Sequence, residues 1–279
     1  MRLLFEELDK KPLCSEDRIG RYKDWIKNAT MARKNLTQEG KAPDKKSNQY
    51  DKAEELITFY TFAPLCLRED KVEIVQEMLR LVDAKTEVGR IKRLSFEEQF
   101  PPPKGYLKWL ANHIDEHPVR FLRKQAIDHM KRGKTLETNT HVDFAVETDN
   151  LLILIEMKFT SDISFQTTFN PNRNQLARLI DVGISAAEKS GKKLVVLLCS
   201  PSEFFAKKSR LYYYKIKEYS DVKEIKKDIE WRKQDEIQKY IEAVAWIPLE
   251  KIIEIVYKDF NHPDREEAID FFRERRLVP

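Results

Sequence analysis

The pattern of hydrophobic positions divides the chain into two parts. Up to about residue 95, apolar residues recur at helical spacing in DRIGRYKDWIKNATMARKN and in EELITFYTFAPLCLREDKVEIVQEMLRLVD, which predicts a helical N-terminal region. The polar stretch TQEGKAPDKKSNQYDK between them predicts an exposed loop. FPPPKG cannot continue a helix, so we expect a boundary there between residues 1–100 and a second domain over residues 101–279.

The second part alternates between helical and strand-like segments. We expect helices over residues 106–131 (interrupted near Pro118), 173–189 and 203–242, and strands over 141–148 and 151–159. KKLVVLLCS is apolar throughout, as is typical of a buried strand, and AVAWIPL predicts another strand before a last helical segment. Helices around a central mixed sheet give an α/β (α+β) fold.

Composition narrows the class of protein only a little. The net charge of +4 is a small difference between 51 basic and 47 acidic residues, which permits a nucleic-acid partner without requiring one. Seven glycines argue against a glycine-rich phosphate-binding fold. The three cysteines lie far apart in the sequence and no apolar run is long enough to span a bilayer, so we expect a cytoplasmic protein that does not enter a membrane.

Candidate chemistry lies in HVDFAVETDNLLILIEMKF, residues 141–159. If Asp149-Asn150 is the centre of a two-residue hairpin turn, paired residues have numbers that sum to 299, and Asp143 lies across from Glu156 on one face of the sheet. Lys158 shares that face. Opposed carboxylates repel unless a proton, a lysine or a cation lies between them.

A divalent cation suits this pair best, because Mg²⁺ prefers hard oxygen ligands and retains several waters. We expect Asp143, Glu156 and the backbone carbonyl of Met157 to hold Mg²⁺, with Mn²⁺ as a substitute. Such a metal polarises a phosphodiester and activates a bound water. Lys158 would orient that water and stabilise charge that develops on the phosphate.

These residues resemble the PD-(D/E)xK nuclease superfamily, which has the restriction-endonuclease-like fold. The signature is an acid, a spacer and Glu-x-Lys on the next strand, here Asp143 and Glu156-Met157-Lys158. The family core is a helix, a three-stranded antiparallel meander, a helix and a further strand. The resemblance covers residues 105–200 and implies Mg²⁺-dependent phosphodiester hydrolysis, with Asp143 and Glu156 as metal ligands and Lys158 as the catalytic lysine.

The chain departs from the family pattern at two points. Val142 stands where the motif has its proline. The family also has an acid on its first helix, for which Glu116 and Glu137 are alternative candidates as a third metal ligand.

The segment FTSDISFQTTFNPNRNQLARLIDVG resembles a stretch in uncharacterised prokaryotic members of the superfamily. Asn174 and Arg178 lie on one face of its predicted helix, with Gln175 beside them, and are candidate contacts to nucleic acid. The Gln-x-x-x-Tyr motif of some nucleases is missing, since Leu179 is four residues after Gln175.

Two other functions compete with a nuclease. The acids and Lys158 can form a structural ion pair in a catalytically inactive nuclease fold that binds nucleic acid or a protein partner. HIDEH, residues 113–117, matches the H-x-x-E-H pattern of zinc hydrolases, although Pro118 biases His117 away from helical geometry.

The sequence thus predicts a metal-dependent endonuclease that acts on DNA. Cleavage of both strands needs two copies of such a site, so a homodimer is a further expectation.

Overall fold

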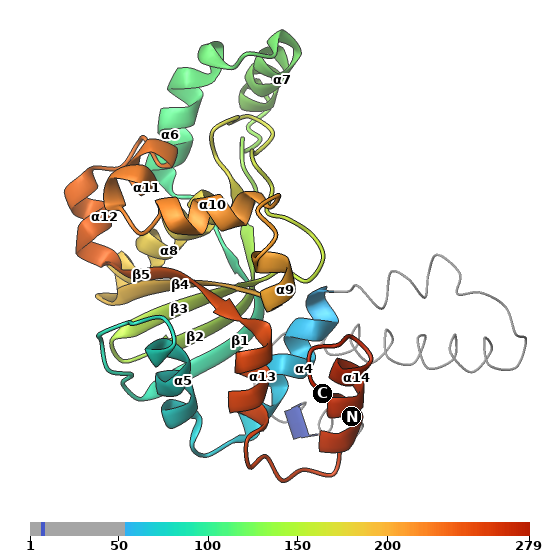
Figure 1. Cartoon of the computed structure of the whole chain (residues 1–279). Helices are drawn as coiled ribbons and strands as arrows, with labels where there is room; N and C mark the ends of the chain where they lie inside the picture. The colour runs from blue at the N-terminus through green and yellow to red at the C-terminus, as the bar shows by residue number, and fades with distance from the viewer. Residues whose placement is uncertain (1–6, 9–53) are drawn as a thin grey trace, which may run out of the picture.

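The computed structural model of the chain describes residues 7–8 and 54–279, and it consists of a mixed five-stranded sheet between two layers of helices (Figure 1). The strands are β1 (Ile91–Phe100), β2 (Thr140–Thr148), β3 (Leu151–Met157), β4 (Lys193–Ser200) and β5 (Ile241–Pro248). They lie in this order across the sheet. The α/β (α+β) class with a mixed sheet flanked by helices is confirmed.

The sheet changes from antiparallel to parallel at β3. β1, β2 and β3 form an antiparallel meander, whereas β4 and β5 run parallel to β3. The crossover between β3 and β4 is α8 (Gln175–Ser190), which packs on the sheet so closely that a Cβ at Gly183 would lie 2.8 Å from side-chain atoms of Leu194. A helix in this crossover is required because parallel neighbours cannot be joined by a tight turn.

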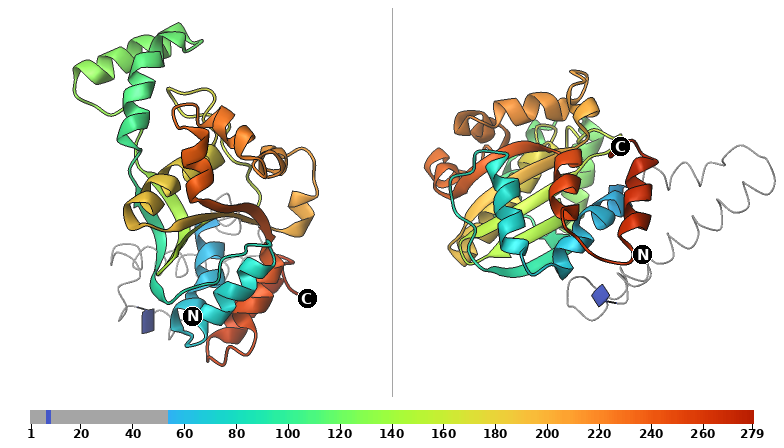
Figure 2. Two further views of the ribbon diagram at one scale, coloured as in Figure 1. Left: turned by 90° about the vertical axis from the view of Figure 1, so that its left-hand side faces the viewer. Right: turned by 60° about the horizontal axis from the view of Figure 1, so that its bottom comes forward.

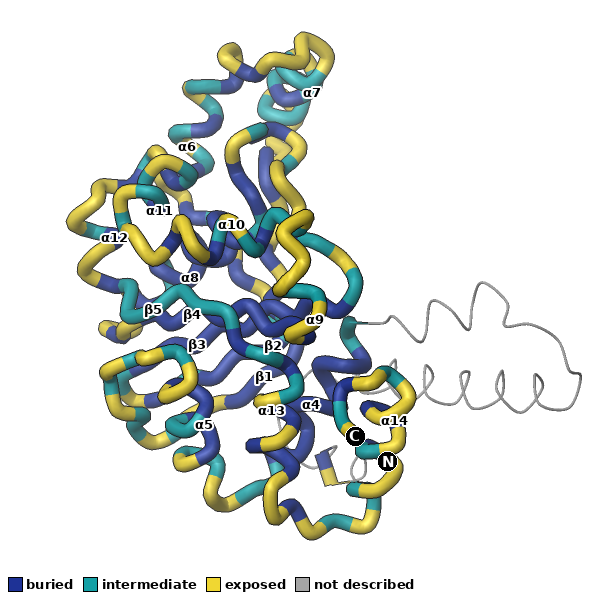
Figure 3. Tube along the Cα trace, in the orientation of Figure 1, coloured by how far each residue is buried: buried dark blue, intermediate teal, exposed yellow. Residues whose placement is uncertain are grey.

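One face of the sheet is covered by α4 (Glu54–Leu67), α5 (Lys71–Arg80), α13 (Leu249–Tyr257) and α14 (Arg265–Arg273). α4 is apolar on nearly all sides and is the most buried of them (Figure 3). Pro64 lacks the N–H that would bind the carbonyl of Tyr60, and the Tyr257 hydroxyl donates to that carbonyl instead at 2.6 Å. A long-range contact therefore compensates for the proline inside the helix.

The other face is covered by α8 and by helices that follow β4. These are α9 (Ser202–Phe205), α10 (Leu211–Glu218), α11 (Val222–Asp228) and α12 (Gln234–Tyr240). The prediction of one long helical region over 203–242 is therefore corrected to four short helices. Side chains begin two of them, since Asp162 accepts from Leu211 N at 2.6 Å and Asp221 accepts from Lys223 N at 2.8 Å.

An insertion between β1 and β2 projects away from the sheet (Figures 1 and 2). It contains α6 (Lys104–His113), the 3₁₀ helix η1 (Ile114–Glu116) and α7 (Arg120–Lys131), with the predicted interruption before Pro118. We call residues 101–139 the arm. It has its own small core, to which Phe169 of the loop after β3 contributes.

The predicted N-terminal region differs from expectation in its last part. α4 and α5 are helical as predicted, but residues 91–100 form β1, which pairs with β2. The sheet thus takes strands from both sides of FPPPKG, which connects β1 to the arm. The predictions for DRIGRYKDWIKNATMARKN and the polar loop after it lie outside the described residues. No helix in the described part of the chain has the length and apolar character needed to cross a membrane.

Candidate active site

The predicted hairpin register is confirmed. The residue pairs between β2 and β3 run from Phe144 opposite Ile155 to Glu147 opposite Leu152, and in each pair the numbers sum to 299. The turn closes differently from the expected one, because neither Asp149 nor Asn150 has a positive φ. The Thr148 hydroxyl instead accepts from Leu151 N at 2.8 Å and from Asn150 N at 3.2 Å.

This register brings Asp143 to the end of β3 that carries Glu156 and Lys158. Asp143 lies one residue beyond the Phe144–Ile155 pair, and its Oδ2 accepts a hydrogen bond from Met157 N at 2.7 Å. Lys158 N donates to the carbonyl of Cys199 at 2.8 Å, which fixes the backbone of the Glu-x-Lys segment against β4. The three residues of the predicted motif are therefore neighbours.

Lys158 is the centre of an ion-pair cluster. Its Nζ lies 2.9 Å from Oε1 of Glu156 and 3.3 Å from Oε2 of Glu54. The side chains of Lys158 and Glu156 are only 8% and 4% exposed. A buried cation between two carboxylates forms strong, directional contacts.

Glu54 was not among the predicted site residues. It lies in the first turn of α4, where a carboxylate is stabilised by the helix dipole. Its Oε1 accepts from Phe159 N at 3.0 Å and from the Ser161 hydroxyl at 2.6 Å, while Oε2 faces Lys158. An acid at the start of the apolar helix EELITFYTF was the available signal, although sequence alone does not show that α4 ends beside β3.

Gln175, at the start of α8, completes the cluster from the face of the sheet opposite to α4. Its Nε2 donates to Oε1 of Glu156, and its Oε1 accepts from Ser164 N at 3.3 Å. The same glutamate oxygen thus receives Gln175 and Lys158. These two donors fix the orientation of the Glu156 carboxylate.

Burial and the neighbouring charges shift the pKa of each ionisable group in the cluster. Burial, and then the charge of Glu156, raise the pKa of Asp143 well above its usual range. Burial also raises the pKa of Glu156, against the opposing effect of Lys158. Burial lowers the pKa of Lys158, but Glu156, Glu54 and Asp143 outweigh it, so the pKa rises and the amine stays charged. The cluster therefore holds three acids and one cation.

The two other predicted nucleic-acid contacts have internal partners. Asn174 is 2% exposed, accepts from Ala177 N at 3.0 Å as the N-cap of α8, and donates to Tyr219 and Asp228. Arg178 donates from Nη2 to the carbonyls of Thr138 and Asn139 at 2.8 and 2.9 Å. Of the three, only Gln175 touches an acid of the cluster.

The two candidates for a third acidic ligand lie elsewhere. Glu137 is buried and forms an ion pair with Arg173 at 3.0 Å. Arg173 also pairs with Asp181 at 2.8 Å and lies over the ring of Tyr106 at 3.8 Å. Glu116 is exposed in η1 of the arm. Neither contacts Asp143, Glu156 or Lys158, whereas Glu54 does contact Lys158.

The HIDEH segment does not form one helical face. α6 ends at His113, and His117 has extended backbone angles of φ −60° and ψ 128°, as the following proline predicts. Nδ1 of His113 is bonded to the carbonyl of Trp109 at 2.8 Å, and Nδ1 of His117 accepts from Val119 N at 3.1 Å. This geometry does not place the two histidines on one helix face as zinc ligands.

The acids nevertheless fit a hard cation. In the described residues, no group of three His, Cys, Asp or Glu side chains is arranged to hold a metal ion. Asp143 and Glu156 form a pair of neighbouring carboxylates, and Mg²⁺ is commonly held by one or two carboxylates with waters in its other positions. Burial, and then the charge of Glu156, raise the pKa of Asp143, and Lys158 offsets this only in part.

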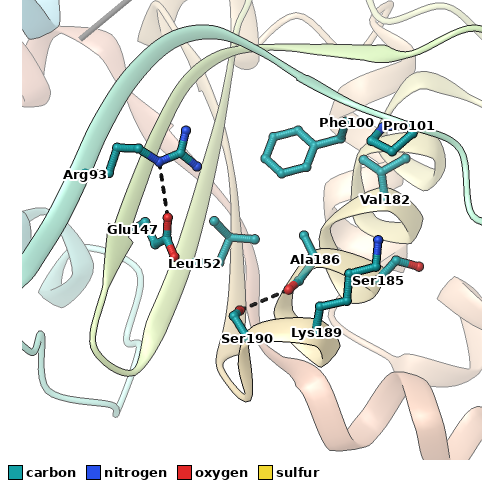
Figure 4. A pocket seen from close by; sticks show the side chains of 10 residues that line it. All are labelled: Arg93, Phe100, Pro101, Glu147, Leu152, Val182, Ser185, Ala186, Lys189 and Ser190. Atoms are coloured by element: carbon teal, nitrogen blue, oxygen red, sulfur yellow. Dashed lines mark hydrogen bonds and ion pairs between the residues drawn. The ribbon is translucent and has the colours of Figure 1, made fainter. Parts of the chain in front are cut away.

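A pocket of about 220 Å³ lies apart from this cluster (Figure 4). It opens between α8 and the other end of β2, where Arg93 pairs with Glu147 at 3.2 Å. None of Asp143, Glu156 and Lys158 lines it.

Comparison with known proteins adds no assignment: no family model, no curated protein and no solved structure matches the chain.

Proposed function

We propose that the protein is a Mg²⁺-dependent endonuclease of the restriction-endonuclease-like type that cleaves DNA. The observation that carries the proposal is the cluster of Asp143, Glu156 and Lys158 at the adjacent ends of β2 and β3. Lys158 lies between the carboxylates of Glu156 and Glu54. A structural ion pair needs only one acid for one lysine. The additional buried acids are costly without a cation, and such groups concentrate at functional sites.

The order of elements supports the same proposal. A helix, a three-stranded antiparallel meander, a helix and a parallel strand occur in this order as α4, β1–β3, α8 and β4, with α5 as an additional helix between α4 and β1. In this alignment α4 takes the place of the first helix of the family core, and the arm is an insertion. Glu54 then replaces Glu116 and Glu137 as the acid expected on that helix.

Asp143, Glu156 and the backbone carbonyl of Met157 are the groups that would hold Mg²⁺, with Mn²⁺ as a substitute. When bound, the metal supplies a polarised phosphate and a water of lowered pKa. Because Asp143 already accepts from Met157 N at 2.7 Å, its carboxylate is held beside β3 before any cation binds. This preorganisation lowers the cost of binding.

Lys158 acts as a charged donor in this mechanism. Its raised pKa keeps the ammonium protonated at neutral pH, so it is suited to donate to a phosphate oxygen or to the attacking water and unsuited to act as a base. Glu54 keeps the ammonium charged and in position. Gln175 fixes the orientation of the Glu156 carboxylate by donating to its Oε1.

A second candidate is a nuclease-like fold that binds nucleic acid without cleaving it. The observation in its favour is that Lys158 already lies within 3.3 Å of two acids and can take the place of a cation. In that case the cluster stabilises the fold, and removal of Lys158 lowers stability without loss of function.

Plasmid nicking and linearisation with Mg²⁺ or Mn²⁺ tests the proposal, with the wild type, Asp143→Ala and Lys158→Ala compared in parallel. Lys192→Ala is the matched control. Lys192 is also a buried lysine, and its partner Glu147 lies on β2, as Asp143 does. We expect cleavage by the wild type and the control only. Absence of cleavage by folded wild type with either ion would support the binding protein instead.

The expected homodimer is a separate part of this proposal. Light scattering of the protein with and without a DNA duplex measures it directly. A strict monomer in both conditions would exclude the dimer and leave nicking of single strands as the expected activity.

A further inference from the structure

The arm leaves the sheet at the edge where the acid cluster lies. Phe100, the last residue of β1, pairs with Thr140, the first residue of β2. Asp143 follows three residues later, and the adjacent end of β3 carries Glu156 and Lys158. Figures 1 and 2 show α6 rising from this edge and α7 at its far end. A helix of ten residues is about 15 Å long, so α7 lies roughly that far from the edge.

Positive charge is concentrated at the end of the arm. Residues 119–134 contain one acid, Asp128, and six basic residues: Arg120, Arg123, Lys124, Lys131, Arg132 and Lys134. The formal charge of this segment is +5, whereas the whole chain carries +4, so the rest of the chain is net −1. A protein of almost balanced charge therefore has one strongly basic element.

These basic side chains are available to a partner. Five of the six are exposed, and Arg123 is half-buried, where its Nη1 donates to the carbonyl of His117 at 2.6 Å. Within the described residues, none of the six forms an ion pair with an acid of this chain. Phe121 is 71% exposed at the start of α7, an unusual position for a large apolar side chain.

Buried contacts join the arm to the elements that carry the cluster. Arg173 pairs with Glu137 at the base of the arm and lies over Tyr106 of α6. Phe169, in the loop that joins Lys158 to Gln175, packs in the core of the arm and meets the ring of His129 at 5.3 Å. A ligand held by α7 is therefore at a fixed position relative to the acids.

We infer that α7 and the turn after it bind the phosphate backbone of the nucleic-acid substrate at a distance from the scissile phosphodiester. This inference rests on the proposed function, because it assigns the substrate-holding surface of that same site. Unpaired lysines and arginines on one element are the groups that displace counterions from a polyphosphate. Such contacts position a substrate without reading its sequence.

The arm offers a contact about four to five base pairs from the cluster, since B-DNA rises 3.4 Å per base pair along each strand. Phe121 lies at the same end of the arm, where it can meet a sugar or a base. We therefore expect very short substrates to lose this contribution.

Fluorescence anisotropy with a labelled 20-base-pair duplex tests the inference over a salt titration. The test variant replaces Lys131, Arg132 and Lys134 by glutamine. The matched control replaces Lys251, Lys258 and Arg273, three exposed basic residues on the far side of the molecule. We expect the test variant to bind roughly tenfold or more weakly at 0.15 M salt, with a salt slope smaller by about 2.7 for three lost phosphate contacts.

Hydrolysis of bis(p-nitrophenyl) phosphate separates the arm from the proposed chemistry, because this small diester cannot reach α7. We expect the test variant to keep wild-type rates on it, and Lys158→Ala to lose them while still binding the duplex. Equal weakening by the test and control variants, or tighter arm-dependent binding to vesicles of anionic lipid than to duplex, would overturn the inference. Arm-dependent duplex binding without any hydrolysis by the wild type would overturn the proposed function alone.

Discussion

Lys158 Nζ lies 3.3 Å from Oε2 of Glu54, although 104 residues separate them in the sequence. The contact joins the strand that carries the Glu-x-Lys motif to the first turn of α4. The other oxygen of Glu54 accepts from Phe159 N and from the Ser161 hydroxyl. One carboxylate thus holds both the charge of Lys158 and the backbone that follows it.

Replacement of Glu54 by glutamine removes the charge and keeps the shape. We expect DNA cleavage to fall about 10- to 100-fold, as is usual when the partner of a metal-site residue is removed. Glu73→Gln is the control, because Glu73 is an exposed acid in the first turn of α5. If Glu54→Gln cleaves at the wild-type rate, Glu54 is only a structural residue.

Asp143→Asn is expected to separate activity from stability. A carboxyl with a folded pKa above its unfolded pKa contributes stability that is complete below the unfolded pKa and is lost as pH rises through the folded pKa. The raised pKa of Asp143 therefore makes the metal-free wild type less stable as pH rises from acid toward neutral. Asparagine does not titrate and keeps an acceptor for Met157 N.

We expect Asp143→Asn to be more stable than the wild type at pH 8 in EDTA, because the variant carries no buried charge there. The difference should disappear near pH 4, where the wild-type carboxyl is protonated. Urea denaturation at both pH values measures it, and nicking assays should show no cleavage by the variant. A variant less stable than the wild type at pH 8 would show that the acids do not repel.

The hairpin could be predicted because it depends on local pattern. Two apolar runs of alternating face, separated by a turn, fix the register of β2 and β3, and this register brings Asp143 beside Met157 and Glu156. The helix and the strand that follow Lys158 could be predicted for the same reason, because each has its own local hydrophobic pattern. Pro118 also marks correctly where α6 and α7 separate.

Two features depend on tertiary contacts and were therefore not predicted from the sequence. β1 reads IKRLSFEEQF, in which charged residues interrupt the alternation because the strand lies at the edge of the sheet. Glu54 shows no motif in the sequence, and only the packing of α4 against the sheet brings it to Lys158. Asn174 has a structural role that the sequence did not indicate, since its side chain caps α8 by accepting from Ala177 N.

Gln175 and its neighbour Asn174 provide a paired test of these roles. Gln175→Leu removes the donor to Glu156, so we expect kcat to fall roughly 10- to 100-fold with little change in stability. Asn174→Ala removes the N-cap of α8, so we expect a loss of about 1–2 kcal/mol in stability with kcat preserved. Steady-state cleavage and urea denaturation of both variants decide the matter, and the opposite pattern would exchange the two roles.

Arg173→Met tests whether the buried network fixes the arm. Arg173 is 1% exposed, and its removal breaks two buried ion pairs, leaving Glu137 with Arg178 and Asp181 with Arg232 as their remaining cations. Breaking a buried ion pair in this way costs about 3–5 kcal/mol. We expect a corresponding loss of stability in urea denaturation, together with faster hydrogen exchange in α6, because Tyr106 loses the guanidinium over its ring.

Arg273→Met is the control. This exposed arginine pairs with Asp270 at the surface, so its replacement should cost less than about 1 kcal/mol of stability. A loss in Arg173→Met as small as that of the control would mean that the arm is held by its apolar core alone.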